Sequence, residues 1–340
     1  VTDDDAYCPL TSYQRKPTGG GEAYESVNML CKWRKNRFVG DGSSTTYQLD
    51  VTDIDEGATP AASYFITGES ITVQSYDAEK GTVTFASAPK APENAGTSNV
   101  EIKFAKTTED RNKILGCTIF AIYGLDGSSN RVFVSGNSAH GASEWFSGLD
   151  APTYFPDINY SMVGSSDFPI MCYVKAQGEL LIIKRDRQEG TIWHHTGSMV
   201  NDVAAFPLKE GVPGYGAAAR FSAANLNDDP LYLSPRGVYA PTTTYYNNMQ
   251  VRQLYCRSRR VNRRLCKENG LAEAVSAVWR GWYVLVLPNG RAYVADGNQD
   301  RADNGYEWYY WEGIPAHVLR ADEQTLYFGT RDGRICKFND

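Results

Sequence analysis

The 340-residue chain lacks the sequence signatures of several large protein classes. It has no apolar run approaching the roughly 20 residues that span a bilayer. Its first residues, Val1 to Asp5, are acidic rather than the basic start of a secretory signal. The H-E-x-x-H, G-x-S-x-G and G-x-x-x-x-G-K-[ST] patterns are also missing. We therefore expect a soluble protein without a signal segment, a zincin site, a hydrolase elbow or a phosphate loop.

Cysteine is scarce and scattered. The seven cysteines are odd in number and never spaced as C-x-x-C, which argues against both a zinc site and a disulfide scaffold. We expect most of them to be buried and reduced, in a chain made in a reducing cytoplasm. No residue set predicts a bound metal or cofactor.

Negative charge exceeds positive charge, but only in one region. The chain has 34 basic and 40 acidic residues, a net charge of −6. Residues 38–106 alone contain ten acids and four bases, so the rest of the chain is balanced. The average surface therefore does not attract nucleic acid or an anionic membrane, although a local basic patch still acts within a Debye length of about 8 to 10 Å.

Short strand-like runs separated by turn residues fill most of the sequence. The clearest hairpin joins residues 282–287 to residues 292–295 through Asn289-Gly290, a dipeptide that permits positive φ at both turn positions. Groups of three or four such runs recur every few tens of residues, as in the blades of a β-propeller. We expect an all-β fold, a propeller of short four-stranded blades. A β-sandwich is the alternative, although such domains run near 100 residues.

Composition divides the chain into three segments. Residues 1–37 are expected to start the propeller body, and residues 107–340 to form most of it. Residues 38–106, rich in Thr, Ser, Ala and acids, are expected to form a small inserted β-sandwich-like domain.

One segment has the period of a helix. Between residues 250 and 269, Leu254, Val261 and Leu265 are spaced as an apolar stripe, and Gly270 follows as a stop. The segment also carries seven bases with no acid among them: Arg252, Arg257, Arg259, Arg260, Arg263, Arg264 and Lys267. Such a run contacts phosphates or an acidic partner, or it is a solvated outer face.

Catalytic interpretations have less support. His194 and His195 are adjacent in an expected strand, so their side chains point to opposite faces and do not chelate one metal. A propeller glycosidase needs two carboxylates that meet in space, for which Asp157, Asp167 and Asp186 are candidates. We expect no enzyme activity. Aromatic runs such as 307–311 and Tyr245-Tyr246 are expected to pack in blade cores or at subunit contacts rather than to stack on sugars or bases.

Several segments resemble one family of structural proteins of tailed phages and prophages. The block from Trp145 to Asp157, containing SGLDAPTYFPD, is the most specific of them. The other matching segments are residues 37–42, 81–85, 131–137, 163–167, 178–184, 230–239 and 326–338. This family is similar in turn to the β-propeller tail nozzle, tail hub and packaged-DNA stabilisation proteins of short-tailed phages.

The resemblance implies a non-enzymatic virion protein. Copies are expected to form a ring, a hexamer by this likeness, at the head-to-tail connector or tail nozzle. There they contact the portal, the adaptor and other tail proteins, and hold or guide packaged DNA. No membrane partner is implied. Family members have more chain before the segment matching residues 6–9, so residues upstream of Val1 are expected to be missing. A receptor- or glycan-binding tail module is the alternative, with the glycosidase third.

Overall fold

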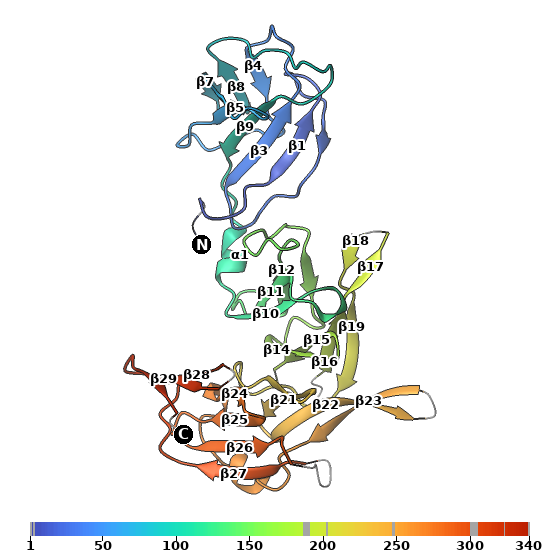
Figure 1. Ribbon diagram of the computed structural model, residues 1–340, viewed down its shortest axis with the longest axis vertical. Helices are drawn as coiled ribbons and strands as arrows, with labels where there is room; N and C mark the ends of the chain where they lie inside the picture. The colour runs from blue at the N-terminus through green and yellow to red at the C-terminus, as the bar shows by residue number, and fades with distance from the viewer. Residues whose placement is uncertain are drawn as a thin grey trace. The chain divides into compact units, whose positions relative to one another are not determined.

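The computed structural model describes residues 2, 4–185, 191–201, 203–246, 249–299, 305–322 and 324–338. Over this part of the chain the protein is all-β, as expected: nearly all of its regular structure is strand, in small sheets that are almost entirely antiparallel (Figure 1). Within it no helix is long and apolar enough to cross a membrane. The chain divides into two compact units, Val1–Gly116 with Trp145–Tyr160, and Cys117–Glu144 with Ser161–Asp340.

The first unit contains a six-stranded and a three-stranded sheet. The six-stranded sheet has the order β2-β1-β3-β9-β5-β6, and the three-stranded sheet has the order β4-β8-β7. The elements are β1 (Leu10–Gln14), β2 (Glu22–Ala23), β3 (Trp33–Phe38), β4 (Thr46–Gln48), β5 (Ala61–Tyr64), β6 (Ser70–Ile71), β7 (Val73–Asp77), β8 (Thr82–Phe85), β9 (Val100–Ala105) and α1 (Arg111–Leu115).

Both sheets of the first unit contribute to one hydrophobic cluster, as a sandwich-like arrangement requires. In β9 the alternate residues Val100, Ile102 and Phe104 are buried in it. On the opposite face Glu101 pairs with bases of β3. The expected division at residues 37 and 38 falls at the end of β3, whose six residues pair with β9. The first compact unit is therefore larger than the expected insert, because β1 and β3 belong to the same sheet as β5 and β9.

The second unit contains most of the remaining strands. They are β10 (Ile119–Tyr123), β11 (Arg131–Ser135), β12 (Ser143–Phe146), β13 (Tyr160–Met162), β14 (Ile170–Ala176), β15 (Glu179–Lys184), β16 (Thr191–Thr196), β17 (Ser198–Val200), β18 (Val203–Ala205), β19 (Leu208–Pro213), β20 (Ala224–Leu226), β21 (Asp229–Ser234), β22 (Gly237–Tyr246), β23 (Met249–Cys256), β24 (Val275–Trp279), β25 (Trp282–Val286), β26 (Ala292–Asp296), β27 (Glu307–Trp311), β28 (Val318–Ala321), β29 (Leu326–Gly329) and β30 (Ile335–Lys337). Its short helical turns are η1 (Leu125–Gly127), α2 (Asn262–Leu265) and η2 (Leu271–Glu273). The division between the units falls within β12 and β13.

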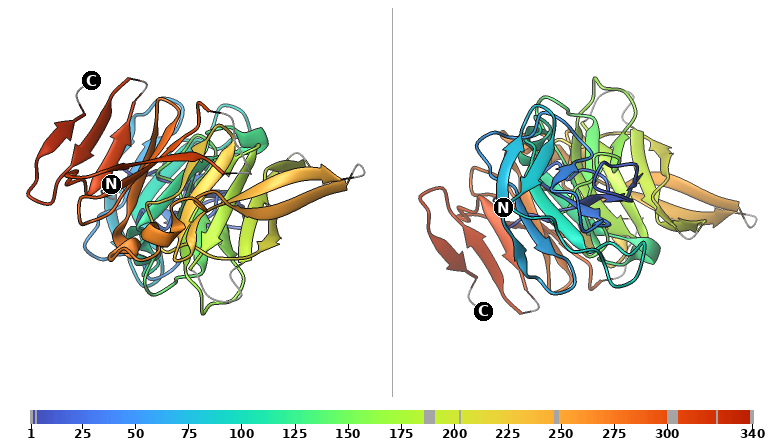
Figure 2. Two further views of the ribbon diagram at one scale, coloured as in Figure 1. Left: turned by 90° about the horizontal axis from the view of Figure 1, so that it is seen from below. Right: turned by 90° about the horizontal axis from the view of Figure 1, so that it is seen from above.

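Five sheets follow one another in chain order. Four of them have four strands, in the orders β10-β11-β12-β13, β14-β15-β16-β19, β20-β21-β22-β23 and β24-β25-β26-β27, and the fifth is β28-β29-β30. The first strand of each sheet contacts the first strand of the next, from β10 through β14, β20 and β24 to β28. From β14 onward the sheets lie side by side in chain order (Figure 2). A small hairpin, β17-β18, stands apart from this series.

Strand β25 shows how neighbouring sheets pack. Residues 283–286 are all buried, with no alternation between buried and exposed positions. Tyr283 and Leu285 pack in the cluster shared with the β20–β23 sheet, whereas Val284 and Val286 pack in the cluster shared with β28–β30. A sheet with apolar side chains on both faces must be covered on both sides. The middle sheets of the series are therefore internal layers.

The expected helix over residues 250–269 is wrong for most of its length. Residues 249–256 form β23, which pairs with β22 from Tyr239↔Cys256 to Tyr246↔Met249, and only residues 262–265 are helical. The three stripe residues serve different cores: Leu254 packs beside the β14–β16 sheet, while Val261 and Leu265 pack against the β20–β27 cluster. Eight backbone pairs with β22 outweigh the weak helical period of the segment.

The cysteines only partly follow the expectation. All seven lie in the described part of the chain, and none forms a disulfide. Cys31 and Cys172 are buried, but the other five are half-buried, so the expectation that most are buried is wrong. Burial raises the pKa of the Cys172 thiol well above its ordinary value.

Candidate basic cleft

Four of the predicted bases line one cleft of about 560 Å³, which we call the basic cleft. They lie on the segment from the end of β23 to η2, and Arg291 joins them from the turn before β26. The lining residues are Arg260, Val261, Arg263, Arg264, Lys267, Glu268, Arg291, Tyr293 and Tyr310. With five cations and one carboxylate, this lining carries a net positive charge in a chain that is acidic overall.

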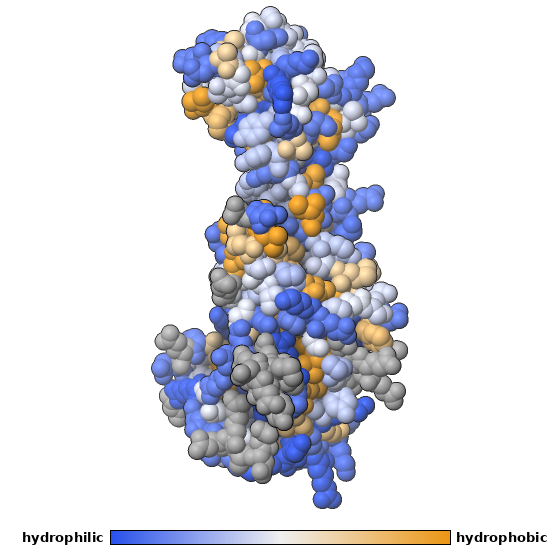
Figure 3. Space-filling model, turned by 90° about the vertical axis from the view of Figure 1, so that its right-hand side faces the viewer, coloured by the Kyte–Doolittle hydropathy of each residue, from blue (hydrophilic) through white to orange (hydrophobic). Residues whose placement is uncertain are grey.

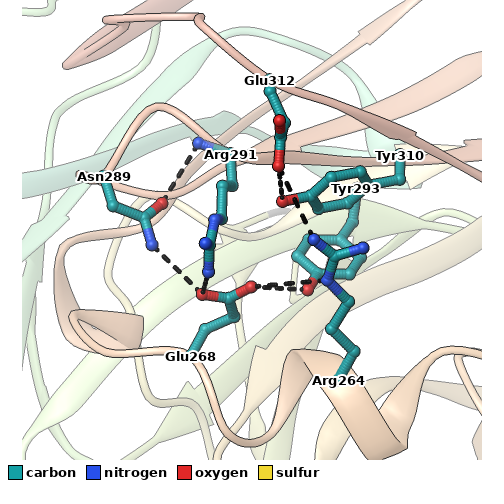
Figure 4. Close-up of polar contacts among 7 residues, drawn as sticks. All are labelled: Arg264, Glu268, Asn289, Arg291, Tyr293, Tyr310 and Glu312. Carbon is teal, nitrogen blue, oxygen red and sulfur yellow. Dashed lines mark hydrogen bonds and ion pairs between the residues drawn. The ribbon is translucent and has the colours of Figure 1, made fainter.

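Glu268 is the centre of the polar contacts at the floor of the basic cleft (Figure 4). Its side chain is only 5% exposed. One carboxylate oxygen accepts hydrogen bonds from Arg291, at 2.8 Å, and from Asn289, at 3.1 Å. The other accepts one from the Tyr293 hydroxyl at 2.9 Å. Because every donor comes from the β25–β26 hairpin, Glu268 fixes the basic segment onto that hairpin.

These contacts also set the charge of the carboxyl group. Burial acts to raise the pKa of Glu268, but the hydrogen bonds from Arg291 and Tyr293 outweigh it, so the pKa lies below its ordinary value. Glu268 is therefore ionised at neutral pH. Its charge keeps Arg291 protonated, since the same hydrogen bond raises the pKa of that guanidinium.

The guanidinium of Arg264 lies over an aromatic ring. Its guanidinium carbon is 3.5 Å from the centre of the Tyr310 ring, and one nitrogen is 3.7 Å from a Glu312 oxygen. The Tyr310 hydroxyl donates a hydrogen bond to the same Glu312 oxygen at 2.7 Å. A stacked guanidinium keeps its N–H groups in its own plane, where they remain available at its edge.

The remaining cations of the basic cleft are exposed. Arg260 pairs with Glu307 on β27. Arg263 and Lys267 have no ion-pair partner among the residues that the structure describes. Two of the five cations are therefore neutralised by no carboxylate of the described chain.

The other three predicted bases lie elsewhere. Arg252 is on β23 and pairs with Glu179 on β15. Arg257 is 3% exposed and donates to Asp229, at 2.7 Å, and to Thr242, so it is a structural residue in the core. Arg259 is exposed and does not line the basic cleft. The expectation of seven bases on one helix is therefore corrected to four bases in one cleft, because residues 249–256 form a strand and because Arg252 and Arg257 pair with acids from distant parts of the chain.

Sequence reasoning missed four residues of the cleft: Glu268, Arg291, Tyr293 and Tyr310. Glu268 follows Lys267 directly, so the acid beside the basic run was visible. Arg291 follows the Asn289-Gly290 turn, and no spacing in the sequence relates it to the basic run. The aromatic run 307–311 packs as expected, since Trp308 and Tyr310 pack against the β20–β27 cluster and Trp311 against the next one.

A second cavity lies beside the first strands of four of the five sheets. Its volume is about 920 Å³, and its lining includes residues of β10, β14, β24 and β28 and of the segment before β20. Phe120 and Phe221, which line it, are 69% and 58% exposed. Three arginines, Arg185, Arg220 and Arg320, line it as well.

The described residues give little support to the catalytic interpretations. His194 and His195 lie on β16, and only His195 is fully buried, in agreement with opposite faces. Asp157 and Asp167 belong to different compact units, and Asp186 lies outside the described residues. Among the described residues no group of three His, Cys, Asp or Glu side chains is placed to hold a metal ion. The side chains of Tyr245 and Tyr246 lie outside the described part.

Hydrophobic side chains form small separate groups on the face drawn in Figure 3, rather than one continuous apolar surface.

No family model matches the chain, and a search of characterised proteins finds no match either. The resemblance to tailed-phage structural proteins stays a prediction.

Proposed function

We propose that the protein is a non-enzymatic structural component of a tailed-phage virion, located at the head-to-tail connector or tail nozzle. The observation that supports this most is the series of five small sheets, of which four contribute their first strands to the lining of one cavity. A body of this kind is stiff, because each inner sheet is held on both faces. Stiffness suits a part that must keep its shape while DNA is held or passes through.

The body is a β-propeller in this proposal. Its blades are the β10–β13, β14–β19, β20–β23, β24–β27 and β28–β30 sheets. Contacts between successive first strands, and a cavity lined by four of these strands, are what a central propeller channel requires. The two-sided burial of β25 is what an inner blade requires.

Copies of the chain form a ring in this proposal, as the phage resemblance implies, expected to be a hexamer. The ring contacts the portal, the adaptor and other tail proteins, and the basic cleft faces either packaged DNA or an acidic surface of a neighbouring subunit. Closed rings of identical chains use heterologous contacts, in which two different surfaces of the same chain meet.

A receptor- or glycan-binding tail module is the second candidate. The observation that favours it is the pair of exposed aromatic residues, Phe120 and Phe221, in the cavity among the first strands. Aromatic faces in a concave site with arginine side chains are able to stack on sugar rings and hold their hydroxyl or acidic groups. Binding of the isolated protein to a glycan array, lost in the Phe120→Ala and Phe221→Ala variants, would favour this candidate over the nozzle.

Native mass spectrometry of the purified chain tests the ring over a range of micromolar concentrations. The expected result is one closed oligomer whose population increases with concentration while the population of the monomer decreases. The accompanying measurement is protein mass spectrometry of purified particles, in which the chain should be a stoichiometric component. A monomer at every concentration, together with absence from the particles, contradicts the proposal.

A further inference from the structure

We propose that the basic cleft is a binding site for phosphate groups, with Arg263 and Lys267 as its primary contacts. The inference rests on the proposed function only for the source of the phosphate, which is then the backbone of packaged DNA. The chemistry itself rests on the cleft.

The net positive charge of the basic cleft favours an anionic ligand. The cleft has five cations, of which three already pair with carboxylates: Arg260 with Glu307, Arg264 with Glu312, and Arg291 with Glu268. Arg263 and Lys267, which line the cleft as well, add two positive charges with no carboxylate from the described residues to balance them. Like charges brought together repel, so this arrangement favours the binding of an anion.

Two arginines of the basic cleft are already held in place by other side chains. Arg291 is held by the buried carboxylate of Glu268, and the guanidinium of Arg264 lies over the Tyr310 ring (Figure 4). Neither side chain has to be ordered when a ligand binds, so less conformational entropy is lost. Glu268 is a positioning residue in this account: it orients Arg291 without contacting the ligand.

The donor groups and the size of the basic cleft favour phosphate over an acidic protein surface. Guanidinium groups bind phosphate through paired N–H donors, and a phosphate group offers more acceptor oxygens than a carboxylate does. Three arginines of the cleft already pair with carboxylates of the chain. A cleft of about 560 Å³ admits a sugar-phosphate unit. The geometry therefore favours a compact, oxygen-rich anion.

The experiment compares three probes: inorganic phosphate, short duplex DNA of mixed sequence, and poly-L-glutamate. The test variant is Arg263→Gln/Lys267→Gln, which breaks no ion pair among the described residues. The matched control is Arg259→Gln, an exposed base of the same segment that does not line the cleft. Circular dichroism and thermal unfolding establish that each variant is folded. Calorimetry gives the affinity, and a salt titration gives the slope of log K against log salt.

The expected result is binding of inorganic phosphate that weakens at least about tenfold in the double variant and is unchanged in Arg259→Gln. If DNA is the source, it binds with a salt slope that the double variant reduces by about 2, one for each lost phosphate contact. Binding of phosphate without binding of DNA supports the site and assigns it to free phosphate.

Three results overturn the inference. One is equal affinity of the wild type and the double variant for phosphate. Another is no binding of phosphate or DNA at low salt. The last is preferential, variant-sensitive binding of poly-L-glutamate, which assigns the cleft to an acidic protein. In each case native mass spectrometry of the same samples shows whether the ring still forms, so this inference fails separately from the proposed function.

Discussion

At the scale of single residues, Glu144 and His195 form an ion pair that has no contact with solvent. Both side chains are 0% exposed. The second oxygen of Glu144 accepts a hydrogen bond from the Tyr173 hydroxyl at 2.8 Å, so the pair joins residues of β12, β14 and β16. Burial acts to lower the pKa of His195, but the hydrogen bond and the charge of Glu144 outweigh it and raise the pKa above 6.5.

This pair predicts a dependence of stability on pH. Because the pKa of His195 is raised by folding, its contribution is fully present below about 6.5, the ordinary value, and is lost as pH rises through the folded value. At pH 5.5 the His195→Gln variant should be less stable by about 3 kcal/mol, because it leaves the Glu144 charge buried alone. Urea unfolding of both proteins at intervals between about pH 5.5 and 8.5 measures the difference. A difference that does not shrink at the higher pH values contradicts the assignment.

At the scale of elements, local pattern predicted strands well and the basic segment poorly. The Asn289-Gly290 hairpin and the strands around it were predictable, because turn chemistry and alternation act within a few residues. Residues 249–256 were not, because their conformation is decided by pairing with β22. The four cleft bases were in the predicted set, but the separation of Arg252 and Arg257 from them depends on Glu179 and Asp229, which no local pattern connects to the basic run.

Two-sided burial of β25 is an element-scale claim with a direct test. Leu285→Ala should destabilise the protein by about 2 to 5 kcal/mol, because it opens a cavity in the β20–β27 cluster. Val284→Thr should cost about 1 to 3 kcal/mol, because it buries a hydroxyl on the other face, against β28–β30. Val318→Thr, at a position 59% exposed, is the matched control and should change stability by less than about 0.5 kcal/mol.

Unfolding in urea, followed by tryptophan fluorescence, measures these three variants. A loss in Leu285→Ala with none in Val284→Thr would mean that only one face of β25 is covered. The proposed propeller would then lose the support that it draws from two-sided burial of β25.

At the scale of the whole molecule, net charge conceals the arrangement that matters. The chain carries −6, yet its basic cleft holds five cations around one carboxylate. The acidic excess lies in residues 38–106, which belong to the first compact unit, and the cleft belongs to the second. Composition alone argues against contact with DNA; the distribution of charge in the second unit does not.

The central claim is that copies of this chain form a ring in a tailed particle with the basic cleft toward DNA. A cryo-electron microscopy map of purified particles containing the protein tests it most directly. We expect a closed ring at the head-to-tail connector or nozzle, made of five-sheet bodies, with Arg263 and Lys267 of each copy facing density for DNA. A particle without such a ring, or a ring in which these two side chains face bulk solvent, contradicts it.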